Sequence, residues 1–403
     1  MRLSTIFPIF LFTVPLLIGI VFWELRNRLS RRVVLLAVAS YLVPFLISLA
    51  YFLWSGESYM LLFWGFRVAS LLSFAAAVLV LIKVPSLGSR FAMLFYLAFV
   101  VHACIAWLGF LSVSFRNFLF SIQNIGPMTE VALRWADFTT RLPTLGAMFF
   151  SSGILYAMCS ALLLAEVASK LEFRWRYWVL FAFLAVTGAF IARTALLGPI
   201  VGFFFLLNRN WKRNLLELLL AGVVACGVLS AMTASTKFEP LVQWGFEPVI
   251  NLFQKGTLST RSSTETINTG ALAASNFVER TKIEPSSWLF GAGRMTGDDQ
   301  ISYYGKADIG YVRMMLYGGV PYVFAFFIPA LFAVLIAFVL PFSSITRRAT
   351  LITLLVQLIC NLKGLIDISA TTSFVWIIYE ILRYPHRFDS NPGSQTAFLR
   401  SAK

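Results

Sequence analysis

Long apolar stretches recur along the chain, and short polar connections separate them. A helix needs about 20 predominantly apolar residues to cross the hydrocarbon core of a bilayer, and the pattern predicts about eleven such helices. The expected fold class is an all-α, polytopic bundle of membrane-spanning helices. The predicted spans are Thr5–Trp23, Val33–Leu53, Met60–Ile82, Phe91–Val113, Leu142–Ala165, Tyr177–Ala192, Leu196–Leu207, Leu215–Met232, Val312–Val339, Ala349–Leu365 and Ser373–Leu382.

The composition favours a bilayer as the solvent. Of the 403 residues, 59% are hydrophobic and 13% are charged, whereas soluble domains carry about 25% charged residues. The mean hydropathy is +0.80, and a soluble protein this apolar would expose large hydrophobic patches to water. Because no small-x-small cleavage site precedes Glu24, we interpret the first stretch as a retained helix and not as a signal peptide.

Positive charge gathers in the short connections. The chain has 33 Lys and Arg against 18 Asp and Glu. In a soluble protein this excess would suggest nucleic acid, but basic connections such as Arg26–Arg32, Arg209–Arg213 and Arg347-Arg348 follow every second predicted span. The positive-inside rule places these connections in the cytoplasm, so no nucleic-acid partner is expected.

The predicted spans divide the chain into four parts. Residues 1–232 hold the first eight helices, 233–308 form a large loop on the outer side, 309–383 hold the last helices, and 384–403 form a cytoplasmic tail. The loop begins with an amphipathic stretch, Phe238–Phe253, which can lie on the membrane surface. Loops of this length in a compact architecture are usually functional.

Residues that bind metals are sparse. The two histidines, His102 within a span and His386 in the tail, do not form a pair. The sequence therefore predicts no cofactor, no metal site and no disulfide framework. The cysteines all fall within apolar stretches: Cys104, Cys159, Cys226 and Cys360.

Arg193 is the first candidate site residue. It lies in Ile191-Ala-Arg-Thr-Ala-Leu-Leu-Gly198, where two predicted spans follow so closely that their turn must be tight. A charge near hydrocarbon is costly and is usually functional or paired, although an arginine can also snorkel to the interface. A planar guanidinium at such a turn suits a phosphate oxygen.

The distal half of the large loop holds the next candidates. Ten residues separate Arg280 from Gly291, and Leu289-Phe-Gly-Ala-Gly293 places Gly291 and Gly293 around a turn. Glycine permits positive φ and close backbone approach, which a turn that cradles an anion needs. Gly-x-Gly also occurs in ordinary loops, so a purely structural role is the alternative.

A carboxylate, a tyrosine and an arginine meet at the start of the ninth predicted span, in Asp308-Ile-Gly-Tyr-Val-Arg313. On a helix, Tyr311 and Arg313 occupy different faces, and Gly318-Gly319 allow a kink or close packing. The alternative is an ordinary helix cap at Asp308. In the next span, Lys363 and Asp367 are four residues apart on one face and form either a functional or a mutually neutralising pair.

Together these segments resemble the family of bacterial O-antigen and exopolysaccharide polymerases, which is related to the O-antigen ligases. Arg280 with its spacing to Gly291 resembles the arginine-x-ten-glycine motif of some members, whereas Ala192 stands where relatives often carry a small polar residue. The resemblance extends from Arg193 to Lys363, and the earlier helices match only in hydropathy. It rests on Arg193-Thr194, Trp244-Gly-Phe-Glu247, Leu289-Phe-Gly-Ala-Gly293, Asp308-x-Gly-Tyr-x-Arg313 with Tyr317-Gly-Gly319, and Leu362-Lys363.

The resemblance implies a C-type glycosyltransferase-like bundle in the bacterial inner membrane, with its active site facing the periplasm. The implied enzyme is a metal-independent polymerase that moves a growing glycan from undecaprenyl diphosphate to a sugar hydroxyl of an incoming lipid-linked repeat unit. Its partners would be the lipid-linked donor and acceptor, membrane lipid and a chain-length regulator protein. Arg193, Arg280 and Asp308 are the implied catalytic residues, and the implied substrate-binding residues are Arg313, Tyr311, Lys363, Gly291 and Gly293.

Two alternatives remain at this stage. O-antigen ligases use a histidine in the large outer loop, but residues 233–308 contain none. A polysaccharide flippase or transporter should carry internal repeats and polar residues at the bilayer midplane, whereas the polar residues here gather at the outer ends of spans. Both observations favour the polymerase.

Overall fold

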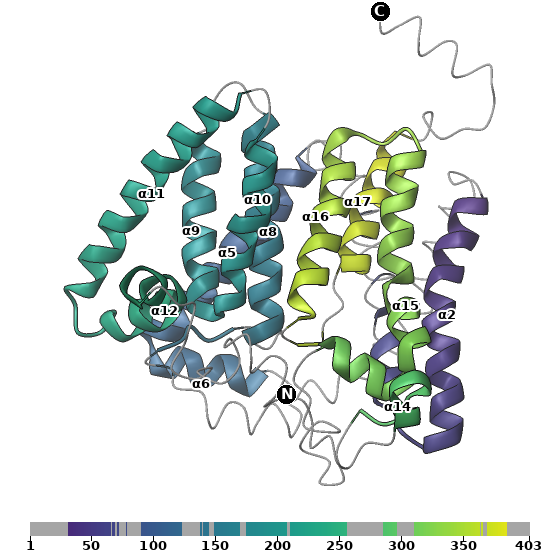
Figure 1. Ribbon diagram of the computed structural model, residues 1–403. Coiled ribbons are helices and arrows are strands. Elements are labelled where there is room, and N and C mark those ends of the chain that lie inside the picture. The colour runs from purple at the N-terminus through teal and green to yellow at the C-terminus, as the bar shows by residue number, and fades with distance from the viewer. Residues whose placement is uncertain are drawn as a thin grey trace, which may run out of the picture. The chain divides into compact units, whose positions relative to one another are not determined.

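The structure is a computed structural model of the chain (Figure 1). All regular secondary structure within the described ranges is helical. Four of the described helices are long and apolar enough to cross a membrane: Phe91–Leu111, Phe150–Ser169, Trp211–Thr233 and Gly310–Val339. The structure describes residues 31–65, 67–68, 71, 78, 90–122, 138, 140–144, 149–169, 175–207, 210–255, 285–295, 310–362, 364–365 and 369–384.

The chain forms two compact units. The first lies mainly within Met93–Val278, and the second combines Phe7–Ala92 with Glu279–Lys403. The first holds α5 (Phe91–Leu111), α6 (Val113–Ile122), α8 (Phe149–Ser169), α9 (Trp175–Ile191), the 3₁₀ turn η2 (Arg193–Leu196), α10 (Leu197–Leu206), α11 (Trp211–Thr233) and α12 (Glu239–Lys255). The second holds α2 (Arg31–Ser55), α14 (Pro285–Phe290), α15 (Gly310–Val339), α16 (Ser344–Cys360) and α17 (Ser369–Arg383).

Helices occur where the hydropathy pattern predicts them, with corrected ends. Residues 142–144 are not helical, and α8 begins only at Phe149. The helix predicted to reach Leu365 ends at Cys360, and the Asn361 side chain that follows it donates to the carbonyl of Gln357 at 2.9 Å. The predicted span Thr5–Trp23 lies outside the described residues, and the predicted span Met60–Ile82 is described only in part.

Small residues bring α10 against α8 in the first unit. A Cβ atom on Gly198 would lie 2.1 Å from the carbonyl oxygen of Ala157, and one on Gly202 would lie 2.6 Å from a methyl group of Leu164. Gly198 and Gly202 are four residues apart, the spacing that lets apolar helices approach closely in a membrane. The helices that carry the Arg193 turn are therefore packed tightly against a buried partner.

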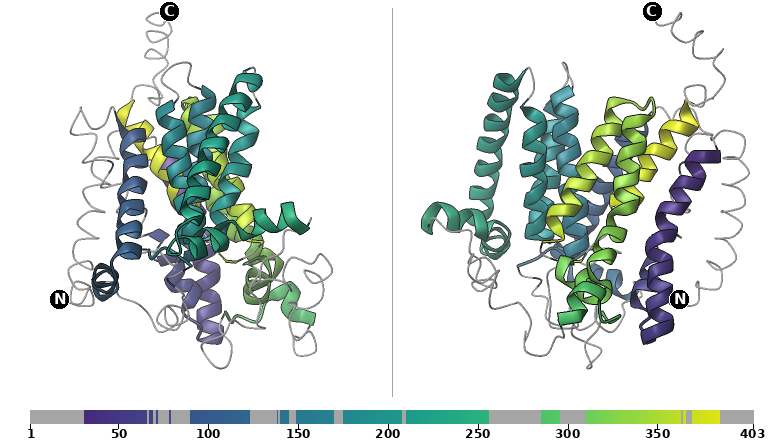
Figure 2. Two further views of the ribbon diagram at one scale, coloured as in Figure 1. Left: turned by 90° about the vertical axis from the view of Figure 1, so that its left-hand side faces the viewer. Right: turned by 45° about the vertical axis from the view of Figure 1, so that its right-hand side comes forward.

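The second unit is organised around α15. The long helix packs along α2 (Figure 2) and against α16 and α17. Its buried side includes Tyr317, Tyr322 and Phe326. The indole of Trp64 donates to the Tyr322 hydroxyl at 2.9 Å, so a polar group within this aromatic core has a hydrogen-bond partner.

Candidate functional site

Arg193 lies in the connection between α9 and α10. Ala192 is extended, with φ −156° and ψ 133°, and η2 makes one tight turn before α10 begins at Leu197. The predicted tight turn is therefore confirmed. The extended residue ends α9 and turns the chain, and Arg193 is the first residue after it.

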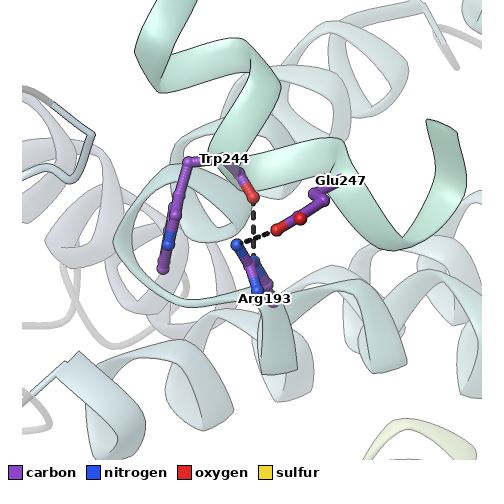
Figure 3. Close-up of polar contacts among 3 residues, drawn as sticks. All are labelled: Arg193, Trp244 and Glu247. Carbon is purple, nitrogen blue, oxygen red and sulfur yellow. Dashed lines mark hydrogen bonds and ion pairs between the residues drawn. The ribbon is translucent and has the colours of Figure 1, made fainter. Parts of the chain in front are cut away.

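The guanidinium of Arg193 contacts α12 in three ways (Figure 3). Its Nε donates to the carbonyl of Trp244 at 2.8 Å, and its Nη2 lies 2.5 Å from Glu247 Oε2. Its central carbon lies 4.7 Å from the centre of the Trp244 ring. The side chains of Arg193 and Glu247 are only 12% and 14% exposed, so the ion pair is largely removed from solvent.

The segment Trp244-Gly-Phe-Glu247 has a local reason for each of its residues. A Cβ atom on Gly245 would lie 2.7 Å from the ring of Phe190, so glycine lets α12 approach the end of α9. Phe246 packs edge-to-face on Phe190, with the ring centres 5.8 Å apart. Trp244 and Glu247 supply the contacts to Arg193. Arg193-Thr194 and Trp244-Gly-Phe-Glu247, which are separate segments of the family resemblance, thus contact each other in one site.

Arg141 belongs to the same site, and the sequence analysis missed it. Its guanidinium carbon lies 4.4 Å from the centre of the Trp244 ring, within the range of a cation–π interaction. The N–H of the next residue, Leu142, donates to the carbonyl of Phe190 at 3.1 Å and holds this segment at the end of α9. An arginine directly before an apolar stretch is the only local signal, and it resembles an ordinary interfacial arginine.

We call Arg141, Arg193, Trp244 and Glu247 the Arg193 cluster. It places two guanidinium groups over one indole, with one carboxylate between helices α9 and α12. The cluster therefore has a net positive charge and several N–H donors at the end of an apolar helix pair. Such an arrangement can bind an anionic oxygen group and direct it by hydrogen bonds as well as by charge.

The glycines of Leu289-Phe-Gly-Ala-Gly293 adopt the predicted positive φ, 77° at Gly291 and 68° at Gly293. Their turn packs on a break in α15, where Gly318 and Gly319 leave helical geometry and Gly319 has φ 69°. The N–H groups of Ala292 and Gly293 donate to the carbonyls of Leu316 and Tyr317 at 2.7 and 2.8 Å. We call this contact between 289–293 and 316–319 the glycine junction.

The glycine junction satisfies carbonyls that the broken helix cannot satisfy itself. Pro321 has no N–H to offer the carbonyl of Tyr317, which lies four residues before it. The loop supplies the missing donor, so the N–H groups expected to cradle an anion bind backbone carbonyls in this structure. From α2, the Tyr51 hydroxyl donates to the carbonyl of Phe290, and Ser55 Oγ donates to that of Gly293. The positive φ of Gly291 and Gly293 and the close packing of their turn on α15 and α2 therefore account for glycine at these positions.

Gly319→Ala is expected to destabilise the protein strongly. An added Cβ would lie 1.9 Å from the carbonyl oxygen of Leu289, at a backbone φ of 69°. Strain and overpacking together should cost about 2–5 kcal/mol, measured as a lower melting temperature in detergent. The matched control is Gly56→Ala, because Gly56 has φ 75° but open space around its Cβ position. Equal losses in the two variants would show that the contact with Leu289 contributes nothing.

The start of α15 lies against the end of α16. Tyr311 donates its hydroxyl to the carbonyl of Leu358 at 2.8 Å and its N–H to that of Asn361 at 3.3 Å. A Cβ atom on Gly310 would lie 2.7 Å from the carbonyl of Gly364, so these backbones nearly touch. Arg313 is buried, at 7% exposure. Gly310 closely follows Asp308 in sequence, and Gly364 directly follows Lys363.

The described candidate residues fall into separate groups. Arg193 belongs to the first unit with Trp244 and Glu247, whereas the glycine junction and the start of α15 belong to the second unit. Arg280, Asp308, Lys363 and Asp367 lie outside the described residues. Within the described part of the chain, no three His, Cys, Asp or Glu side chains are grouped to hold a metal ion.

Comparison of the chain with protein-family models, with curated proteins and with solved structures gave no match. The function must therefore be argued from the residues and their geometry.

Proposed function

We propose that this protein is an inner-membrane polymerase of lipid-linked oligosaccharide repeat units. The observation that carries the proposal is the Arg193 cluster: a nearly buried, directed guanidinium at the end of two apolar helices, with a second arginine on the same indole. A lipid-linked diphosphate presents its anionic group at the boundary between hydrocarbon and water. Guanidinium groups at the ends of membrane helices are suited to bind it there.

The reaction needs charge stabilisation at the leaving group. A sugar hydroxyl of the incoming repeat unit attacks the anomeric carbon of the donor glycan, and the bond from that carbon to the diphosphate oxygen breaks. The lipid diphosphate leaves with the bonding electron pair, so negative charge grows on its oxygens. Arg193 and Arg141 stabilise this charge, and preorganised donors of this kind are among the largest contributions to catalysis.

Trp244 and Glu247 position the Arg193 guanidinium. The Trp244 carbonyl accepts a hydrogen bond from Nε of Arg193, and the Glu247 carboxylate accepts one from Nη2. These two bonds fix the plane of the guanidinium group. An exposed arginine loses conformational entropy when it binds a ligand. A guanidinium that is already held in place loses less, so binding costs less free energy. We assign Glu247 a positioning role that depends on its contact with Arg193.

The remaining roles belong to the second unit. Asp308 accepts the proton of the attacking hydroxyl as general base, and Arg280 is a further residue that we assign to diphosphate binding. We also assign substrate binding to Lys363 and, at the start of α15, to Tyr311 and Arg313. The proposal is supported by the contact of Gly310 with Gly364, since these residues neighbour Asp308 and Lys363 in sequence. The proposed enzyme works without a metal ion, on the periplasmic side, and with a chain-length regulator protein as its partner.

The broken helix α15 also bears on the transporter alternative. Transporters use discontinuous helices whose exposed carbonyls coordinate ions. In α15 the carbonyls of Leu316 and Tyr317 accept hydrogen bonds from the loop that carries Ala292 and Gly293. The loop therefore packs on the break in α15, and its hydrogen bonds occupy these two carbonyls, which does not favour an ion site there.

Cells that lack this protein are expected to accumulate lipid-linked glycans with a single repeat unit. Without polymerisation, donors and acceptors remain unjoined, and expression of the intact chain should restore long products. The measurement is the size distribution of lipid-linked glycan in membranes. Long chains that stay unattached to their final acceptor would support the ligase instead, and an unchanged distribution would contradict both.

A further inference from the structure

An apolar groove lies between α9 and α11. It has a volume of about 670 Å³, within the range of about 300–1,000 Å³ that is typical of small-molecule sites. Small side chains line both of its long walls, so neither helix fills the space between them. These residues are Ala182 and Ala185 on α9, and Ala221, Gly222 and Ala225 on α11.

Protein contacts close both ends of the groove. At one end, the Asn214 side chain donates to the carbonyl of Leu206 at 2.8 Å, which ties α11 to the end of α10. The Trp178 indole donates to Glu217 at 2.7 Å and ties α11 to α9. Beyond these contacts α11 diverges from α9 (Figure 1). One face of α12 lines the other end, with Val242, Phe246, Val249, Ile250 and Phe253.

A transmembrane helix of a partner protein does not fit a groove of this form. A helix with its side chains is about 10–12 Å wide, and one that crosses the bilayer would have to continue past both closed ends. A flexible hydrocarbon chain, in contrast, can end inside the groove. The form of the groove therefore favours a lipid chain over a helix.

The lining of the groove changes from apolar to polar along α11. It is apolar from Leu218 to Leu229, and Ser230 and Thr233 follow. The Thr233 hydroxyl already donates to the carbonyl of Ser230 at 2.7 Å, whereas Ser230 is exposed and its hydroxyl can donate to a ligand. None of the described residues that line the groove is charged. This profile matches a hydrocarbon chain that ends in neutral ester groups.

The apolar part of the groove has the length of one acyl chain. Leu218 and Leu229 are eleven residues apart on α11, which corresponds to about 16 Å at 1.5 Å per residue. The hydrocarbon core of a bilayer is about 30 Å thick and consists of two layers of acyl chains, so each chain spans about 15 Å. A chain that starts at Ser230 therefore reaches the closed end near Trp178 and Glu217.

We propose that this groove binds one acyl chain of a diacyl phospholipid, with the ester groups of the lipid at Ser230. The bilayer supplies this lipid at high concentration, and the groove opens to it, because Gly222 and Cys226 are exposed. In hydrocarbon surroundings the chain is held by van der Waals contacts with both walls and with α12. It fills a space that α11 leaves open, since the apolar stretch of this helix is not buried inside the protein. The inference does not depend on the proposed polymerase, because no residue of the groove has a role in that reaction.

Two glycines on α11 provide a matched pair of variants. Gly222 lines the groove and Gly227 does not, and a Cβ atom at either position would meet nothing within 4 Å. The experiment measures the dissociation constant of the purified, full-length protein for dioleoyl phosphatidylethanolamine in detergent, by native mass spectrometry. Gly222→Trp should raise this constant about tenfold, as expected for the loss of roughly ten carbon–carbon contacts, and Gly227→Trp should leave it unchanged. Equal constants for the two variants would overturn the inference.

A second measurement uses the unaltered protein and does not depend on the folding of a variant. Cys226 lines the groove, whereas Cys104 is exposed on α5 and does not line it. Addition of dioleoyl phosphatidylethanolamine to the detergent-solubilised protein should slow the alkylation of Cys226 by N-ethylmaleimide and leave the rate at Cys104 unchanged. Equal slowing at both cysteines would mean that lipid only coats the apolar surface, and it would contradict a site in the groove.

The class of lipid is tested by competition in the same assay. Dioleoyl phosphatidylglycerol should displace phosphatidylethanolamine with an equal dissociation constant, because the described lining carries no charge that would select a head group. An affinity about tenfold higher for phosphatidylglycerol would show selection of an anionic head group. The same preference for a polyisoprenyl phosphate would show a site for a carrier lipid. Either preference would overturn the assignment of the groove to a diacyl phospholipid.

Discussion

Arg193→Ala is expected to abolish glycan chain formation while the protein still accumulates in the membrane. The substitution removes the guanidinium that stabilises the leaving diphosphate, and loss of one such preorganised donor lowers turnover by about 10²–10³-fold. Arg193→Lys should restore little activity, because a point charge cannot donate to the Trp244 carbonyl and a phosphate with the geometry of a planar fork. The measurement is chain formation from lipid-linked repeat units in membranes matched for protein content.

The same side chain also holds α12, so the binding role needs a separate control. Glu247→Ala removes the partner that Arg193 contacts at 2.5 Å and so weakens the attachment of α12, while the contacts of Arg193 with Trp244 remain possible. If Arg193 binds the diphosphate, Arg193→Ala should reduce turnover far more than Glu247→Ala. Equal reductions, with no further loss in the double variant, would assign Arg193 a structural role only. Full activity of Arg193→Lys would contradict the need for a planar guanidinium at this position.

Asp308→Asn is expected to lower turnover by about 10²–10⁴-fold, because asparagine keeps the shape but cannot accept the proton of the attacking hydroxyl. Binding of the lipid-linked donor should remain similar, since arginines hold its diphosphate. Turnover and donor affinity are measured on the same purified preparation. Asp299→Asn is a matched control, because it makes the same change in the same loop at a residue without a proposed role.

The alternative role of Asp308 predicts a different result. As a helix cap, it could be replaced by asparagine, which caps equally well. Activity of Asp308→Asn close to that of the unaltered protein would therefore eliminate the general base and leave the cap. Loss of both turnover and donor binding would contradict the general base as well and would assign Asp308 the task of orienting a phosphate-binding arginine.

The sequence by itself determined the helical class and the approximate position of the long apolar helices that the structure describes, but not α6 or α14. Runs of apolar residues at α2, α9, α11 and α15 are local properties, and a membrane environment makes hydropathy a strong signal for a helix. Local chemistry also predicted the tight turn at Arg193, and it allowed either a kink or close packing at Gly318-Gly319, where the helix breaks, because extended or positive-φ backbone depends on a few neighbouring residues. Helix ends were less predictable: α8 begins at Phe149 and not at Leu142, and α16 ends at Cys360 and not at Leu365, because apolar residues continue beyond the helical backbone.

Only the tertiary structure decided which of these segments meet. Arg193 contacts Trp244 and Glu247 across about fifty residues of chain, and Arg141, from an earlier segment, contacts the same indole. The glycine turn at 291–293 resembles an anion cradle in sequence, yet its N–H groups bind the carbonyls of Leu316 and Tyr317. Periodicity records which face of a helix is apolar but not which partner covers it. The partner is chosen by close packing at residues such as Gly198 and Gly245.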